Sequence, residues 1–323
     1  MNLMAAMLLF LIADPRIGEA SGIAEGIVHP GAVYVQNDSG DSPRFFALDQ
    51  HSGRTVATYT VPGAANIDWE DIAVARDRRG VASVWLADIG DNDANRAEVR
   101  IYRVDEPRGD AVGQPEVWRL RYPDGPHDAE SLAVAPGGAA FIVTKSLLGS
   151  SAVYAVPARP GGVQTLRKIG EIRFRLTGTP GGPNLVGQLT ATGAAFSRDG
   201  KVLAVRTYTD AYLWRVVNGN VGAALPATPV RVALPAQPQG EGIAVDGSRL
   251  LVDSEGRHSA VYAVPLPRVA VTPSPTPSPT PAPRATATPE REQQDRDPFP
   301  IGVVAAALAV AGFLVVWLVR RRR

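Results

Sequence analysis

Residues 70–91 read EDIAVARDRRGVASVWLADIGD, and this stretch contains the pattern that decides the fold. Carboxylates open it, an apolar run follows, and a polar segment with Gly leads to a second apolar run. Short apolar runs separated by Gly, Asp and Asn are typical of strands joined by tight turns. The stretch therefore predicts two antiparallel strands, the first with acidic residues at its head.

The same opening occurs five times along the chain. Each copy has a polar or acidic residue, one spacer, an aliphatic residue or Ala, and then Ala. The copies lie at 21–24, 70–73, 130–133, 192–195 and 241–244. Second and third strands are predicted after every copy, and a fourth after the first four. Four short strands in each unit of about 50 residues indicate an all-β fold, a β-propeller. Five four-stranded blades are favoured over a β-sandwich, with six as an alternative if residues 160–188 contain a further blade.

The fifth unit reaches its third strand near Leu266 and has no fourth strand of its own. Propellers commonly close their ring with a strand from the other terminus. Residues 7–17, MLLFLIADPRI, are predicted to be that strand. A weak export signal over residues 1–16 is the alternative, although no Lys or Arg precedes the apolar run. The propeller is expected over residues 17–267.

The C-terminal part predicts a membrane anchor. Residues 268–300 are rich in Pro, Thr and Ser, which favours an extended stalk. Residues 301–319 are uncharged and mostly apolar, long enough as a helix to span roughly 29 Å of bilayer. Residues 320–323 are all Arg, which the positive-inside rule places in the cytoplasm. We therefore expect a single-pass cell-membrane protein with stalk and propeller outside the cell.

In a propeller the first strand of each blade lines the central channel, so residues at the strand heads should form a ring. These are Ser21, Glu70, Glu130, Thr192 and Glu241. Glu19 lies two residues before Ser21 and would face the same side of a strand. The predicted metal ligands are accordingly Glu19, Glu70, Glu130 and Glu241.

Four converging carboxylates repel one another unless a cation, an ion pair or protonation compensates their charge. Oxygen ligands without Cys suit Ca²⁺ or another divalent cation such as Mg²⁺. Ion pairs to Arg76, Arg206 or Arg257 are the equally weighted alternative. Asp68 and Asp71 are interpreted as rim or turn residues.

Polar residues that follow the second strands, together with His127 shortly before Glu130, predict a ligand-binding rim. Its members are Asp38, Asp88, Asp91, Asn92, His127 and Asp253. A helical calcium loop starting at Asp91 is not supported, because Arg96 and Tyr102 occupy its Gly and Glu positions. Turn formation is the simpler interpretation of Asp93 and Asn95, and histidines scattered in this way are most often surface residues.

Composition excludes several classes of function. The formal net charge of +1 gives no support for nucleic-acid binding, and the absence of Cys excludes thiolate sites. No nucleophile elbow, P-loop or His-Glu-x-x-His motif is present. A monomer is expected, and no catalytic residue is assigned.

The stretches DWEDIAVA, LADIGDNDANRAEVRIYRV, PHDAESLAVAP, VTKS, RTYTDAYLWR and QGEGIAVD resemble a group of secreted bacterial β-propeller proteins. More distantly, residues 15–267 are similar to the esterase-like-phytase, calcium-binding and gluconolactonase-type propellers. The last of these hold a divalent metal with channel Glu, Asn and Asp. The resemblance implies Glu70, Glu130 and Glu241 as ligands, while Ser21 and Thr192 depart from an acidic pattern.

Three functions follow as expectations. The first is a surface-displayed binding module for an extracellular ligand or cell-wall polymer, with a divalent cation in its channel. The second is a metal-dependent hydrolase of the lactonase or phosphoesterase type. The third is a structural propeller whose channel glutamates are ion-paired.

Overall fold

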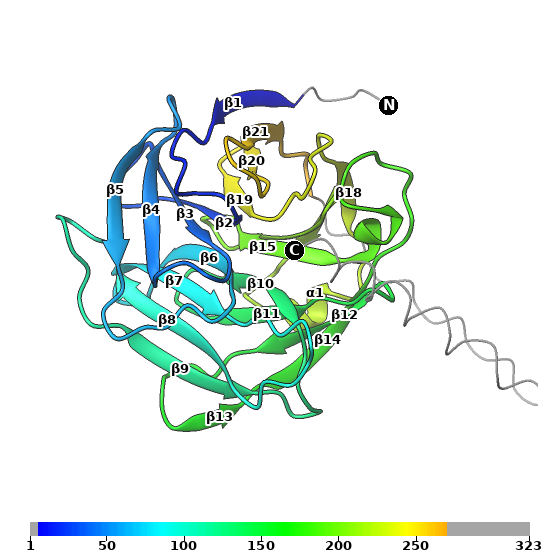
Figure 1. The fold of residues 1–323 in the computed structure, drawn as a ribbon. Coiled ribbons are helices and arrows are strands. Elements are labelled where there is room, and N and C mark those ends of the chain that lie inside the picture. Colours follow the sequence, from blue (N-terminus) through cyan, green and yellow to red (C-terminus); the bar gives the residue numbers. More distant parts are fainter. Residues whose placement is uncertain (1–5, 270–323) are drawn as a thin grey trace, which may run out of the picture. The chain divides into compact units, whose positions relative to one another are not determined.

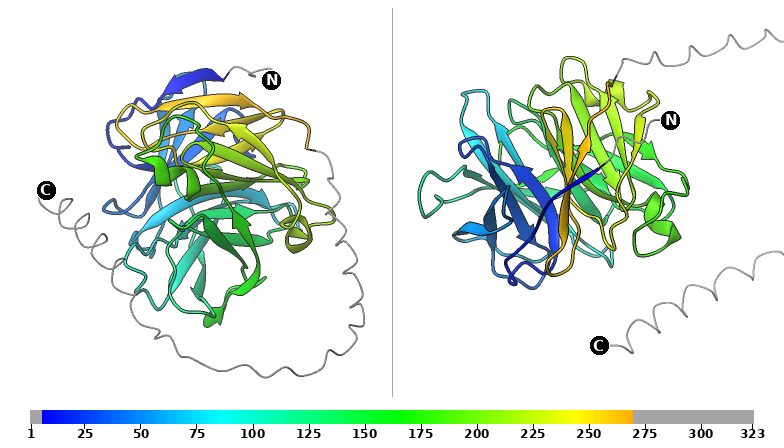
Figure 2. Two further views of the ribbon diagram at one scale, coloured as in Figure 1. Left: turned by 90° about the vertical axis from the view of Figure 1, so that its right-hand side faces the viewer. Right: turned by 90° about the horizontal axis from the view of Figure 1, so that it is seen from above.

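The computed structural model describes residues 6–269, which build five sheets around a common axis (Figures 1 and 2). Blade 1 consists of β2 (Ala20–Glu25), β3 (Ala32–Asn37), β4 (Arg44–Asp49) and β5 (Thr55–Thr60). Blade 2 consists of β6 (Trp69–Arg76), β7 (Ala82–Asp88), β8 (Val99–Asp105) and β9 (Glu116–Arg121). Blade 3 consists of β10 (Ala129–Val134), β11 (Ala140–Thr144), β12 (Ser150–Ala155) and β14 (Arg167–Arg173).

Blade 4 consists of β15 (Ala191–Phe196), β16 (Val202–Thr207), β17 (Asp210–Arg215) and β18 (Val230–Ala233). Blade 5 consists of β19 (Ile243–Asp246), β20 (Arg249–Val252), β21 (Ala260–Pro265) and β1 (Met7–Leu11). The five-bladed all-β propeller predicted from the repeat is thereby confirmed. Each repeat opening becomes the head of an innermost strand, β2, β6, β10, β15 or β19.

Residues 160–188 do not form a sixth blade. Within them, β13 (Val163–Thr165) runs parallel to β9 and extends blade 2 by one strand, while β14 completes blade 3. A 3₁₀ helix, η1 (Leu185–Leu189), precedes β15. A short helix, α1 (Val221–Ala224), connects β17 to β18.

The N-terminal strand occupies the place of the missing fourth strand. β1 pairs antiparallel with β21, with Leu8 opposite Tyr262 and Leu11 opposite Ala260. Figure 1 shows this blue strand beside the yellow strands of the last unit. Phe10 is buried in the core between blades 5 and 1, whereas Leu8 is half exposed.

This closure predicts a strong effect at Phe10. Phe10→Ala should lower the free energy of unfolding by about 3 kcal/mol, since it leaves a cavity where both chain ends join. Leu8→Ala in the same strand should change it by less than about 0.5 kcal/mol. Urea denaturation measures both. Equal, small losses would mean that β1 does not hold the ring.

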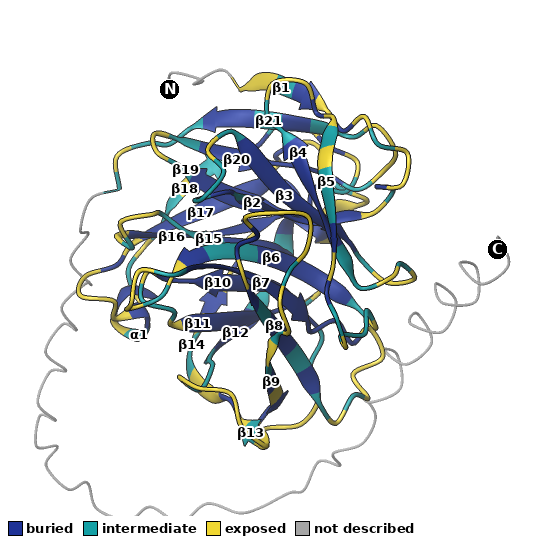
Figure 3. Cartoon of the chain, turned by 90° about the vertical axis from the view of Figure 1, so that its left-hand side faces the viewer, coloured by how far each residue is buried: buried dark blue, intermediate teal, exposed yellow. Residues whose placement is uncertain are grey.

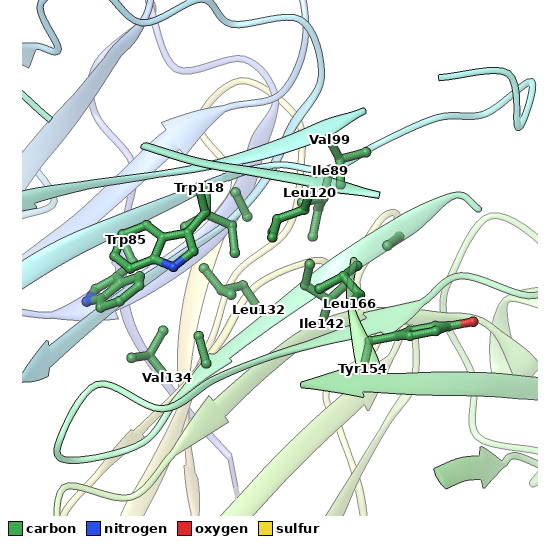
Figure 4. Close-up of a cluster of buried hydrophobic side chains, with 14 of the residues drawn as sticks. Trp85, Ile89, Val99, Trp118, Leu120, Leu132, Val134, Ile142, Tyr154 and Leu166 are labelled. Carbon is green, nitrogen blue, oxygen red and sulfur yellow. The ribbon is translucent and has the colours of Figure 1, made fainter. Parts of the chain in front are cut away.

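The core divides into five apolar clusters, one at each interface between neighbouring blades. Side chains alternate along the strands, so Val33 and Val35 of β3 face blade 5 while Tyr34 faces blade 2. Between blades 2 and 3, Trp85 and Trp118 pack with ring centroids 4.9 Å apart (Figure 4). Figure 3 shows that the inner strands are largely buried and that exposed residues concentrate in the loops.

The direction of the strands distinguishes the two ends of the channel. Inner strands start at the end that we call the mouth, and second strands return to it, so second-to-third-strand loops surround the mouth. β21 runs away from the mouth and ends with Pro265 opposite Arg249. Among residues 6–269, no helix has the length and apolar character needed to cross a membrane. The predicted stalk, span and Arg tail lie outside the described residues.

Candidate metal centre

The predicted ring residues are all buried at the mouth. In blades 1 to 4 the strand register shifts around them, between residues 20 and 22, 69 and 71, 129 and 131, and 191 and 193. A β-bulge of this kind leaves the extra residue unpaired and redirects its side chain. The repeat therefore encodes a bulge at the head of four inner strands.

Three carboxylates meet at one side of the mouth. Asp38 follows β3 of blade 1, and Asp68 and Glu70 open β6 of blade 2. One oxygen from each lies within 4.8 Å of the others, close enough to share a cation. The Ser21 hydroxyl donates to Glu70 Oε2 at 3.2 Å and orients that carboxylate.

Proximity and burial make this group electrostatically unfavourable without a cation. Burial and then the charge of Asp68 raise the pKa of Asp38 to about 7. Burial, followed by the charges of Asp38 and Asp68, raises the pKa of Glu70 well above its usual value. Burial likewise raises the pKa of Asp68. A bound cation would relieve the same repulsion that protonation relieves.

Gly90 leaves the space in which these carboxylates lie. A methyl group at this position would overlap Glu70 Oε1 and Asp68 Oδ2. Its backbone N–H donates to the Asp68 carbonyl at 3.2 Å. The glycine of the sequence IGDN after β7 thus leaves free the space that the two carboxylates occupy.

Glu130 has a different role from the one predicted. Its Oε1 forms an ion pair with the Lys145 ammonium group, and Lys145 follows β11 of the same blade. The positive charge of Lys145 also acts on Asp68, Glu70 and Glu241, where it opposes the rise in pKa that burial causes. Ion pairing therefore accounts for part of the ring, through a lysine and not through the three arginines proposed from sequence.

Among the described residues none of those arginines forms an ion pair with a ring glutamate, although the charge of Arg206 acts on Glu241. Arg206 is fully buried and donates to backbone carbonyls, including Gly242 O at 2.8 Å. Arg76 donates to Gly80 O at the opposite end of its strand. Arg257 is exposed beside the loop that contains Glu19.

Glu241 and Glu255 form the blade 5 side of the mouth. Glu241 is 3% exposed, and its Oε2 has no hydrogen-bond partner among residues 6–269. Burial and then the charge of Glu255 raise its pKa well above the usual value. Burial and then the charge of Glu19 raise the pKa of Glu255 to about 7. On this side Glu241 thus has an unpartnered buried oxygen among the described residues, whereas the half-buried Glu255 accepts the Gln239 side-chain amide.

Glu19 does not enter the ring as predicted. The expectation used two-residue alternation along a strand, but Glu19 precedes β2, and the bulge at residues 20–22 interrupts the alternation. Glu19 is exposed, and its backbone N–H donates to Asn37 Oδ1 at 3.2 Å.

The predicted rim residues on blade 2 mainly stabilise their own loop. Asp88 is fully buried and forms an ion pair with Arg96 at 2.9 Å. Asp91 accepts the backbone N–H groups of Asn95 and Arg96 at 2.9 and 2.7 Å. Asn92 is exposed at the surface of the same loop.

His127 lies outside the acidic group. Its Nε2 pairs with Asp124 at 3.0 Å, and its ring packs against Tyr122 and Tyr154. The surface interpretation of the histidine therefore agrees with its position. The group of residues close enough to share a cation consists of Asp38, Asp68 and Glu70 and does not include His127.

Asp253 is buried in blade 5 and is not part of an open rim. Its Oδ1 accepts the Gly242 N–H at 2.7 Å, which fixes the segment before β19. Burial raises its pKa to about 6, and the Arg206 charge opposes the rise.

This shift predicts how stability depends on pH in chelator-treated protein. A carboxyl whose pKa is raised on folding favours the folded state below the unfolded pKa, and the benefit is lost as the pH rises through the folded pKa. Because of Asp253, the free energy of unfolding should therefore fall by about 2–3 kcal/mol as the pH rises from ~4 to ~7. Asp253→Asn keeps the acceptor for Gly242 and should remove that part of the slope. Denaturation at several pH values tests this, and identical slopes would contradict it.

Asp71 was assigned to the rim or a turn, and this is wrong. Its carboxylate is fully buried and crosses to two other blades, where Oδ2 accepts Leu132 N at 2.7 Å and Ala194 N at 3.2 Å. Oδ1 accepts the N–H of Ile72 at 2.8 Å. Asp71 thus ties the inner strands of blades 2, 3 and 4 together.

Small residues surround Asp71 in the layer after the ring. The corresponding positions of the other blades are Gly22, Ser131, Gly193 and Gly242. A Cβ at Gly22 would lie 2.8 Å from Asp71 Oδ1, so only Gly leaves room there. Farther from the mouth the channel cavity is lined mainly by apolar residues such as Ile23, Ile72 and Val134, together with Arg76 and the Glu25–Arg198 ion pair. The Asp71 carboxylate therefore separates the acidic mouth from a mainly apolar end.

Sequence reasoning missed Lys145 and Glu255 as members of the mouth, and it interpreted Asp68 as a rim or turn residue and not as a candidate ligand. Lys145 and Asp38 share a signal, since each is the first residue after the second strand of its blade. Aligning the units at that position would have placed both at the mouth.

Neither a protein-family model nor a curated protein matches this chain by sequence. Solved structures align over most of it at low identity. The PQQ-bound aldose sugar dehydrogenase of Streptomyces coelicolor is 13% identical, covers 81% of this chain and 98% of its own, and has a TM-score of 0.45. A gluconolactonase from Xanthomonas campestris is 14% identical over 78% of this chain and 88% of its own, with a TM-score of 0.40. The β-propeller domain of Cps50 (Swd1) from Myceliophteria thermophila is 10% identical over 80% of this chain and 99% of its own, with a TM-score of 0.39. At such identities a likeness concerns the fold alone.

Proposed function

We propose that this protein is a surface-displayed binding module whose channel mouth holds a divalent cation, with Ca²⁺ as the first candidate. The observation that carries the proposal is the convergence of Asp38, Asp68 and Glu70 within 4.8 Å. The Lys145 ammonium group contacts Glu130 instead of these three. Three carboxylates without Cys or His ligands suit a hard cation.

Strand direction supports display of this site. The described chain leaves blade 5 at the end of β21, on the side opposite the mouth. If residues 268–323 form the expected stalk and anchor, the tether is attached at the end of the propeller opposite the mouth. A cation held there has further coordination positions for oxygen atoms of an extracellular ligand or cell-wall polymer. Protease treatment of intact cells should release the propeller, and full protection would contradict the outward orientation.

The cation proposal is tested by melting of the purified full chain after treatment with chelator. Ca²⁺, Mg²⁺, Mn²⁺ and Zn²⁺ are added separately, and a cation that binds only the folded state raises the melting temperature with concentration. We expect the largest rise with Ca²⁺. No rise with any of the four ions would refute the proposal.

Gly90→Ala provides a variant that changes no charge. Its methyl group would displace the Glu70 and Asp68 carboxylates from their present positions. We expect at least about a tenfold weaker response to Ca²⁺, because ligand geometry is lost while net charge stays the same. A normal response in a folded variant would mean that the cation binds elsewhere.

A metal-dependent hydrolase is the second candidate, and it is favoured by the position of Glu255 at the mouth and by the pKa of that residue. This half-buried mouth residue has a pKa raised to about 7, which suits a general acid or base near neutral pH. A cation in the mouth could polarise a lactone carbonyl or a phosphoryl oxygen. Turnover of lactone or phosphoester substrates that is abolished in Glu255→Gln would favour the enzyme over the binding module.

A further inference from the structure

A second site lies on the side of the propeller, between blades 3 and 4 and away from the channel. The groove there is lined by the end of β14 and the residues after it, by β17, and by the segment that leads into β18. Tyr212 and Trp214 of β17 form part of its lining, together with apolar side chains that include Leu176, Leu225 and Pro226. The groove therefore combines aromatic and aliphatic walls.

Arg231 of β18 is held in a fixed position in this groove. Its Nη1 donates to Asp210 Oδ1 at 2.5 Å and to Thr179 Oγ1 at 3.2 Å. Asp210 is fully buried and also accepts the hydroxyl groups of Thr177, Thr179 and Thr209 at 2.7–2.8 Å. A guanidinium braced in this way loses little freedom on binding a further group.

Three of the five N–H donors of Arg231 form no hydrogen bond within residues 6–269. Nε and Nη2 form no hydrogen bond to any residue in the range 6–269, and the side chain is 39% exposed. An arginine presents its donors as a planar fork that matches the two oxygens of a carboxylate or phosphate group. The free edge of Arg231 is therefore suited to an oxyanion.

The Tyr212 hydroxyl provides an independent observation. Tyr212 is only 7% exposed, yet its hydroxyl has no hydrogen-bond partner among the residues described. Buried tyrosine hydroxyls usually have a partner, so an unpartnered one in a groove wall points to a ligand oxygen.

The surrounding charge agrees with an anionic ligand. Arg173 and Arg175 line the same groove and are exposed. Among the described residues that line the groove, the one carboxylate is Glu171, which is paired with Lys168 at 2.8 Å. Positive charge thus predominates here, in contrast to the acidic mouth.

We propose that this groove binds a small amphipathic acid, an oxyanion carried on a compact apolar body. The oxyanion binds the free edge of Arg231 and the Tyr212 hydroxyl, and the apolar body packs against Leu176, Leu225 and Pro226. This site is independent of the cation at the mouth.

Calorimetric titration of the purified full chain tests the proposal with four probes of similar size. Benzoate and phenyl phosphate carry an oxyanion, benzyl alcohol is neutral, and benzylamine is a cation. We expect saturable binding of at least one acid, and binding at least about tenfold weaker for the neutral and cationic probes. The stronger of the two acids identifies the headgroup as carboxylate or phosphate. No saturable binding of either acid, or equal binding of benzyl alcohol, would overturn the proposal.

Three variants locate the site. Arg231→Lys retains a positive charge beside Asp210 but loses the fork, and should weaken acid binding by about tenfold. Tyr212→Phe should weaken it by about three- to tenfold, since one hydroxyl bond is lost. Arg119→Gln is the control, because Arg119 is a similarly exposed arginine on blade 2, paired with Glu98. If Arg231→Lys is unfolded, Tyr212→Phe decides. An unchanged affinity in a folded variant of either kind would overturn the assignment.

Discussion

Asp71→Ala should lower the free energy of unfolding by about 3–6 kcal/mol, the largest loss expected from a single substitution near the channel. The change removes the acceptor for three buried N–H groups, those of Ile72, Leu132 and Ala194. Each such group left without a partner is unfavourable by about 1–3 kcal/mol. Because these groups belong to blades 2, 3 and 4, the loss should affect the whole ring.

Ser131→Ala is the matched control for Asp71→Ala. Ser131 lies in the same layer, and its buried hydroxyl has no hydrogen-bond partner among residues 6–269. Its removal should change stability by less than about 0.5 kcal/mol. Urea denaturation of both variants provides the comparison. Similar values for the two substitutions would show that Asp71 is not the link between the blades.

Lys145→Met is the second prediction with a large effect, and its sign depends on the cation. Without divalent cations the substitution leaves Glu130, which is 5% exposed, beside other carboxylates with no ammonium group. Breaking a buried pair in this way is unfavourable by about 3–5 kcal/mol. The variant should therefore melt well below the wild type in chelator.

Calcium should reverse much of that difference. Removing the Lys145 charge strengthens the attraction of Asp68 and Glu70 for a cation, by about tenfold in affinity. Melting in chelator and in excess Ca²⁺ measures both effects. Lys168→Met is the control, because Lys168 forms an exposed pair with Glu171 far from the mouth. A Lys145→Met variant with unchanged melting in both conditions would contradict the account.

The blade count was accessible from sequence because the physical unit repeats. Each blade buries apolar side chains against both neighbours, and so every unit needs the same alternation, while four of the five units also share the bulged head. The place of β1 followed from an unfilled fourth strand in the last unit. β13 was missed, since three residues that extend an outer edge leave no periodic signal.

The site was only partly accessible, because it depends on how neighbouring units meet. Asp38 joins Asp68 and Glu70 across the interface between blades 1 and 2, and no pattern within one unit encodes that distance. The bulge of blade 2 redirects Glu70, and the corresponding bulge of blade 1 breaks the alternation from which Glu19 was predicted. Glu70 and Asp71 are adjacent in sequence, but the Glu70 carboxylate lies at the mouth and the Asp71 carboxylate lies at the axis.

Radioactive calcium in equilibrium dialysis tests the central claim most directly. Full-length wild type, stripped with chelator and dialysed at neutral pH, should bind one Ca²⁺ per chain. Glu70→Gln should bind at least about tenfold more weakly, because a ligand charge is lost. Glu130→Gln should retain binding, since Glu130 is the partner of Lys145. No bound calcium in the wild type, or equal binding by Glu70→Gln, would contradict a cation site at the channel mouth.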